Sequence, residues 1–230
     1  MPEVRRNAII CGVCGRYTLT SGPGEIDDRF GARLPGLASG RYNVAPTEVI
    51  AIVAADSPGE RRAHAVRWGI QPPWRRGSPL INARAETVAS RHPFAALVRA
   101  RASRCLIPAD GFYEWLRAED RRRPRLPFHF SLADREPFAF AGLWDGEAAT
   151  ILTTEPNELV ARLHDRMPVI LGDRAAERVW LDDELSAEDL PTLCCSLDAV
   201  RMSSRPANTE TNKAGNEGSH LLDVDRETLF

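Results

Sequence analysis

Short strand-like segments separated by turn residues fill most of this sequence and limit the folds it can adopt. Residues 16–20 alternate β-favouring side chains and stop at a Gly-Pro-Gly turn, whereas 49–53 and 63–68 flank the turn 56–59 as in a hairpin. Five more segments of this kind lie at 104–107, 111–115, 128–131, 138–141 and 149–153. The pattern predicts several short, mostly antiparallel strands.

Helical spacing occurs in fewer places. It is present at residues 25–30, 157–164 and 175–181, and at 86–102 with an interruption near Pro93. Residues 69–80 form a loop rich in proline and glycine. Because no repeat, low-complexity stretch or linker divides residues 14–230, the sequence predicts a single α+β domain.

Composition excludes several classes of protein. No apolar run approaches the ~18 residues of a membrane span, so we expect no membrane association. A hydrophobic fraction of 43% excludes global disorder. Five cysteines, two of them adjacent at Cys194 and Cys195, do not suit a disulfide scaffold. We therefore expect a protein of the reducing cytoplasm.

The net charge of −2 conceals an uneven distribution. Residues 1–125 carry +9 and residues 126–230 carry −11. A basic half suggests a polyanionic partner such as a nucleic acid. The alternative is that the two halves fold against each other and largely neutralise. The sequence alone leaves both interpretations open.

Four short stretches place polar side chains in apolar surroundings, at 14–17, 81–87, 111–115 and 164–168. In the third, Glu114 stands between Tyr113 and Trp115, and strand alternation puts its carboxylate opposite the two rings. If that face is buried, the pKa of Glu114 should rise, as a general acid or base requires. If the face is exposed, Glu114 is an ordinary surface residue.

Seven motifs occur in a fixed order between about residues 14 and 171, and together they resemble the SOS-response-associated peptidase (SRAP) family. They are CGRYTL, RYNVAPT, WGxxPxW, NARAET, CLIPADGFYEW, FAGLWD and TTxPNxxxxxxHDRMPVIL. Residues 202–208 resemble the family's final motif only loosely. The resemblance implies one SRAP domain over 14–230, in which a twisted, barrel-like sheet has peripheral helices. It also implies an abasic-site sensor that crosslinks to single-stranded DNA without a cofactor or metal.

The family's nucleophile is a cysteine directly after the initiator methionine, and the matching residue here is Cys14, preceded by Val13. The chemistry needs a free amine on that cysteine, because a 1,2-aminothiol and an aldehyde form an imine and then a thiazolidine. We expect translation to start at Val13, since a GTG start codon is common in genomes that give 29 arginines and one lysine. Residues 1–13 are then a misassigned extension. Two alternatives are that proteolysis, self-catalysed or not, removes them, or that they stay and the protein is inactive.

The resemblance also assigns roles to three other residues. Glu114 is the candidate general acid or base that opens the ring-closed sugar of an abasic site. His164 would act on the sugar hydroxyl or assist imine exchange. Asn82 would orient the amine and the ring of Cys14 by hydrogen bonds.

DNA contacts are expected from the basic half and from the His164 motif. Arg16 and Arg84 lie two residues after Cys14 and Asn82, within reach of flanking phosphates. Trp74 can stack on an unpaired base, and Arg166 is a further phosphate candidate. We expect a monomer that binds single-stranded DNA with abasic sites and is nucleoid-associated when bound.

Three other functions compete with this interpretation. Cys14 and His164 have the residue types of a thiol peptidase, which needs no free amine. A non-catalytic single-strand-binding module would form no covalent product. The CxxC at Cys11 and Cys14 lacks the second ligand pair of a zinc site, and a strand follows it rather than the helix of a redox motif.

Overall fold

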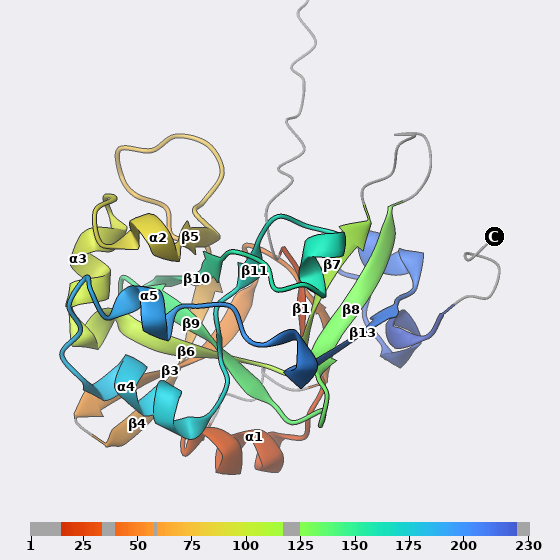
Figure 1. The fold of residues 1–230 in the computed structure, drawn as a ribbon, viewed down its shortest axis with the longest axis horizontal. Coiled ribbons are helices and arrows are strands. Elements are labelled where there is room, and N and C mark those ends of the chain that lie inside the picture. Colours follow the sequence, from red (N-terminus) through yellow and green to blue (C-terminus); the bar gives the residue numbers. More distant parts are fainter. Residues whose placement is uncertain (1–14, 34–39, 58, 117–124, 225–230) are drawn as a thin grey trace, which may run out of the picture.

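The computed structural model describes residues 15–33, 40–57, 59–116 and 125–224. Strands make up most of the ordered secondary structure and belong to two hydrogen-bonded sheets. Helices are few and short, and they lie around the strands (Figure 1). The predicted α+β class with one domain is confirmed.

The first sheet has five strands, and each pairs with its neighbours in antiparallel fashion. Their order across the sheet is β13 (Met202–Pro206), β8 (Leu126–Leu132), β7 (Gly111–Leu116), β1 (Tyr17–Leu19) and β2 (Arg41–Val44). Strand β1 is therefore an inner strand, between β2 and β7, the strand that carries Glu114. Strands β2 and β13 were not predicted, because their sequences are short and largely polar.

The second sheet closes on itself. Its path runs through β11 (Met167–Pro168), β10 (Ala148–Thr154), β4 (Glu60–Trp68), β3 (Val49–Ser57), β6 (Arg104–Ala109), β9 (Phe138–Trp144) and β12 (Ile170–Leu171). Because β9 also pairs with β10, five of these strands form a ring of pairings. The short strand β5 (Asn82–Arg84) adds to β10 in parallel register. The predicted hairpin of β3 and β4 is confirmed.

The interior of the molecule is aromatic and aliphatic. Trp68 is fully buried, with the ring of Tyr17 at 5.4 Å between centroids. Trp115 and Trp144 are only half-buried. The indole N–H of Trp144 donates to the carbonyl of Ala102 over 2.8 Å, which anchors that side chain at the edge of the core.

Five short α-helices in the described part of the chain cover the sheets. They are α1 (Pro23–Phe30), α2 (Ala85–Val88), α3 (Phe94–Arg99), α4 (Arg174–Asp182) and α5 (Leu190–Leu193). Asp173 caps the start of α4, and its carboxylate accepts from the amide of Ala176 over 2.8 Å. Its fully buried Trp180 donates to the carbonyl of Cys105 over 3.0 Å, which attaches the helix to β6.

The helix predicted at 157–164 is wrong. That segment is a bend with one 3₁₀ turn, Val160–Arg162. The side chain of Asn157 accepts from the amides of Leu159 and Val160, and its own amide donates to the carbonyl of Leu197. These bonds satisfy backbone donors at the turn and hold it in place without a longer helix.

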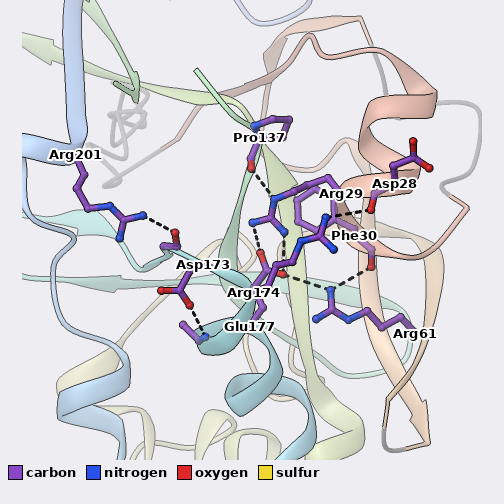
Figure 2. Close-up of polar contacts among 11 residues, drawn as sticks. Asp28, Arg29, Phe30, Arg61, Pro137, Asp173, Arg174, Glu177 and Arg201 are labelled. Atoms are coloured by element: carbon purple, nitrogen blue, oxygen red, sulfur yellow. Dashed lines mark hydrogen bonds and ion pairs between the residues drawn. The ribbon is translucent and has the colours of Figure 1, made fainter. Parts of the chain in front are cut away.

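The basic and acidic halves of the chain meet at a buried carboxylate. Glu177 of α4 has no exposed surface. Its carboxylate accepts hydrogen bonds from both terminal nitrogens of Arg29, over 2.6 and 3.1 Å, and from Nη1 of Arg61 over 3.3 Å. Figure 2 shows both guanidinium groups directed at this carboxylate. Part of the charge of the basic half is therefore neutralised inside the fold.

A buried polar network holds the amino-terminal strand. Asp110 accepts from the hydroxyls of Thr18 and Thr20 over 2.6 and 2.8 Å, and from the amide of Ser21 over 2.8 Å. The Thr18 hydroxyl also lies 3.1 Å from Nε2 of His129 on β8. Neither Asp110 nor His129 was singled out from the sequence.

Burial is the main cause that lowers the pKa of His129 from 6.5 to about 4, and the charge of Arg205 contributes to the shift. The unfolded chain therefore binds this proton at a higher pH than the folded chain. We expect the free energy of unfolding to be undiminished above about pH 6.5 and to fall by about 3 kcal/mol as the pH drops towards 4. His129→Gln should flatten this part of the curve in urea titrations.

The matched control is His220→Gln, at a histidine whose side chain is 51% exposed. It should leave the pH dependence of unfolding unchanged. An equally steep fall in the His129→Gln protein would contradict the role of His129.

Candidate functional site

The pairing of β1 with β7 directs the amino-terminal end of the described chain towards Glu114. Tyr17 lies opposite Phe112, and one step further the amide of Tyr113 donates to the carbonyl of Arg16 over 3.0 Å. The antiparallel register therefore places Gly15 opposite Glu114. Cys14 is the next residue in sequence, and it lies outside the described residues.

Glu114 is buried, with 2% of its surface exposed, and so is its neighbour Tyr113. The alternative in which Glu114 lies on an exposed face is therefore wrong. Tyr113 donates from its hydroxyl to the carbonyl of Tyr42 over 2.9 Å. Burial raises the pKa of Tyr113, so its hydroxyl stays protonated and acts as a hydrogen-bond donor. Strand β7 thus holds a carboxylate within the protein at the point where the chain leads to Cys14.

Strand β10 lies between the two segments that hold the other predicted catalytic residues, Asn82 and His164. It pairs with β5, which begins at Asn82, and with β11, which follows His164 after a short bend. In this arrangement Thr153 lies opposite both Arg84 and Pro168. The segments of Asn82 and His164, which are 82 residues apart in sequence, are thereby brought to one strand.

A groove of about 480 Å³ opens beside β5. Asn82 and Arg84 line it from the strand, and the exposed Trp74 lines it from the loop 69–80. Because β5 is a strand, Asn82 and Arg84 point to the same side, as their spacing predicted. Glu114 and His164 are not among its lining residues in the described part of the chain.

The groove is basic and partly aromatic. Arg75, Arg84 and Arg91 are exposed on it, and no acidic residue is part of its described lining. The ring of Trp74 is 61% exposed and lies 4.4 Å from the ring of His92, measured between centroids. This combination suits a chain of phosphates and unstacked bases.

Arg16 is tied into the fold. Its Nη1 donates to Asn43 Oδ1 over 3.0 Å and to the carbonyl of Thr211 over 2.6 Å. Burial lowers the pKa of Arg16, although Glu48 opposes the shift. The guanidinium therefore links the start of β1 to the carboxy-terminal region. A phosphate contact of Arg16 stays a prediction.

Asn43 is a residue that the sequence motifs contained but did not explain. It is fully buried, and its amide donates to the carbonyls of Lys213 and Asn216, both over 3.1 Å. The sequence contains one indication of this role: within RYNVAPT, the polar Asn43 stands between a tyrosine and a valine, which both favour strands. The carboxy-terminal loops pack against β2 through this side chain.

Arg166 is nine-tenths buried and forms a two-pronged ion pair with Glu86, at 2.7 and 2.8 Å. Its role as a phosphate contact also stays a prediction. His164 is 8% exposed, and its Nδ1 accepts from the backbone amide of Arg166 over 3.1 Å. The Asp165 carboxylate lies 3.0 Å from the same nitrogen.

The described residues lack a metal-binding cluster and a membrane-spanning helix. They contain no group of three or more His, Cys, Asp or Glu arranged to hold a metal ion. None of the helices in those same ranges is long and apolar enough to cross a membrane.

Fold and sequence agree on the class of protein. A solved structure of a protein from Bacteroides thetaiotaomicron shares the fold, with a TM-score of 0.77, 21% identity and coverage of 92% of this chain and all of the other. The family SOS response associated peptidase (SRAP) matches residues 13–214. The chain belongs to this family.

Curated relatives are similar over most of their length. The abasic site processing protein YoaM of Bacillus subtilis is 36% identical, covering 93% of this chain and 99% of the relative. YedK of Escherichia coli, with the same description, is 31% identical over 80% of this chain and 84% of its own. The abasic site processing protein HMCES of Xenopus tropicalis is 26% identical, covering 89% of this chain and 76% of the relative.

Proposed function

We propose that this protein processes abasic sites by forming a covalent crosslink between Cys14 and the aldehyde of the lesion in single-stranded DNA. The relatives with 31–36% identity carry the description of abasic site processing proteins. The family match begins at residue 13, directly before Cys14. Both facts support a shared chemistry at this position.

The reaction joins an amine, a thiol and an aldehyde. The α-amine of Cys14, once it is the first residue, attacks the aldehyde and releases one water to give an imine. The thiol then adds across the carbon–nitrogen double bond and closes a five-membered thiazolidine. The reference pKa values of about 8 for the amine and 8.5 for the thiol leave both groups partly protonated at neutral pH. Nearby proton acceptors therefore accelerate the reaction.

The buried Glu114 is the proposed group for opening the sugar ring and transferring protons. His164 would act on the sugar hydroxyl, and Asn82 would orient the reacting amine. Holding these groups against one aldehyde replaces a bimolecular condensation by a nearly unimolecular one, an effect worth about 7 kcal/mol or more.

The basic groove with Trp74 would hold the DNA next to the lesion. Single strands suit it because a base that is not stacked in a duplex can lie against an exposed ring. Arg84 would contact a flanking phosphate from the same strand that carries Asn82.

The observation that carries the proposal is the register of β1 on β7. It places Gly15, the first described residue, opposite the buried Glu114. This register supports the proposal that Glu114 transfers protons for the cysteine that comes next in the sequence.

The test is the intact mass of the protein expressed from its native gene, before and after incubation with an abasic single-stranded oligonucleotide. We expect a starting mass in which Cys14 is the first residue, followed by a gain of one oligonucleotide less one water. The control is the same oligonucleotide with an intact base.

A protein that retains residues 1–13 and gains no mass would overturn the proposal. Cleavage of peptide substrates by that form would favour the thiol peptidase. Equal binding of both oligonucleotides without a mass change would favour a non-covalent binding module.

A further inference from the structure

Arg166 lies where three segments of the site meet. Its guanidinium binds both carboxylate oxygens of Glu86 on α2, and Nη2 also donates to the carbonyl of Thr153 on β10 over 2.6 Å. Only 11% of the Arg166 side chain is exposed, against 42% for Glu86. A two-pronged pair of this kind, with its arginine largely buried, holds the arginine in one orientation.

The helix that carries Glu86 follows directly after β5 with Asn82, and Arg166 lies two residues after His164. The ion pair therefore joins the segment of one predicted catalytic residue to the segment of another. The bend around His164 has little regular structure of its own until β11 begins at Met167. Side-chain contacts such as this pair are what hold it.

The backbone amide of Arg166 donates to Nδ1 of His164 over 3.1 Å. A nitrogen that accepts this bond carries no proton, so the proton of the neutral ring must be on Nε2. The Asp165 carboxylate, 3.0 Å from the same Nδ1, would favour the opposite tautomer or the doubly protonated ring. The position of the Arg166 amide thus decides between two arrangements of the proton.

We propose that Glu86 and Arg166 are positioning residues, which hold the Arg166 amide on Nδ1 and so keep neutral His164 in the tautomer with its proton on Nε2. This inference rests on the proposed function and assigns a direction to the proton transfers. His164 in this tautomer donates a proton or hydrogen bond to the lesion sugar from Nε2. Proton acceptance then belongs to Glu114.

The first test reads the tautomer without DNA and therefore without the proposed reaction. Long-range ¹H–¹⁵N spectra of the labelled protein, with His164 assigned by comparison with His164→Gln, are recorded about two units above the ordinary imidazole pKa of about 6.5. We expect a protonated Nε2 and an unprotonated Nδ1 in the unaltered protein. Glu86→Ala and Arg166→Met should shift the population towards protonated Nδ1, facing Asp165.

The second test separates positioning from DNA contact by a double-mutant cycle on the rate of adduct formation. We expect Arg166→Met to slow the rate about tenfold and Glu86→Ala somewhat less, because a small displacement of a reacting group is costly. The double variant should be no slower than Arg166→Met, since both changes break one pair. The rates are compared at saturating DNA, because Arg166 is also a candidate phosphate contact and its loss would weaken binding.

A matched control is the exposed ion pair of Arg62 with Asp56, 2.8 Å apart in the hairpin of β3 and β4. Asp56→Ala and Arg62→Met should change neither the tautomer nor the rate.

An unprotonated Nε2 in the unaltered protein, or a His164 spectrum that neither Glu86→Ala nor Arg166→Met changes, would overturn the inference. Failure of the crosslinking proposal itself would instead appear as no adduct with the unaltered protein.

Discussion

Replacing Cys14 by alanine or serine is expected to abolish the adduct that survives denaturation. Alanine keeps the α-amine, so an imine with the lesion can still form, but no thiol is present to close the ring. Serine offers only a weakly nucleophilic hydroxyl. Since an imine hydrolyses readily, neither variant should show a shifted band on a denaturing gel. Adding borohydride should recover a reduced adduct with the alanine variant, because the amine is intact.

Cys195→Ser is the matched control, since Cys195 is exposed and also a free thiol. It should form the adduct at the normal rate. Cys105 and Cys194 are less suitable because both are buried, and burial raises the pKa of the Cys194 thiol to about 12. A denaturation-resistant adduct with Cys14→Ala in the absence of borohydride would refute the thiazolidine chemistry.

Replacing Gly111 by alanine is expected to destabilise the fold by about 3 kcal/mol, which corresponds to a fall of about 10 °C in Tm for a chain of this length. A Cβ at this position would lie 2.1 Å from Nε2 of His129 and 2.8 Å from the backbone oxygen of Phe130. His129 is buried and bonded to Thr18, so it has no room to withdraw. The substitution also acts on β1, because Gly111 lies opposite Thr18.

Gly24→Ala provides the control for this effect. Gly24 lies in the first turn of α1, and a Cβ there meets nothing within 4 Å. Alanine should therefore stabilise the helix slightly, by up to about 1 kcal/mol. Thermal unfolding of both variants measures the difference. A Gly111→Ala protein with unchanged Tm would show that the β7–β8 pairing can open without cost.

The proposed catalytic residues were recognisable in the sequence because each stands in a short motif. Asn82, Glu114 and His164 were all named, and the strand that holds Glu114 was predicted within a residue or two. Strand alternation is a local property with a period of two residues, so a single segment contains it. The same alternation failed to say whether Glu114 is exposed, since strand β7 is buried on both faces at that point.

Contacts between distant segments were not predictable in this way. In the sequence, Arg166 is simply a basic residue in the motif of His164. Its ion-pair partner Glu86 lies 80 residues earlier, so the motif does not reveal the pair. His129 and Asp110 meet through Thr18, which is 111 and 92 residues away from them. Such pairs depend on which strands become neighbours, and no local pattern records that.

By itself, then, the sequence determined the α+β class, most of the longer strands and the proposed candidates for aldehyde chemistry. The tertiary structure decided how these are combined: β10 joins the segments of Asn82 and His164, and β1 on β7 leads towards Glu114. The physical reason is that strand formation follows from adjacent side chains, whereas strand order follows from burying one shared core. Closing the ring of β3, β4, β10, β9 and β6 satisfies their backbone hydrogen bonds together, and only then do the loops of the site have fixed positions.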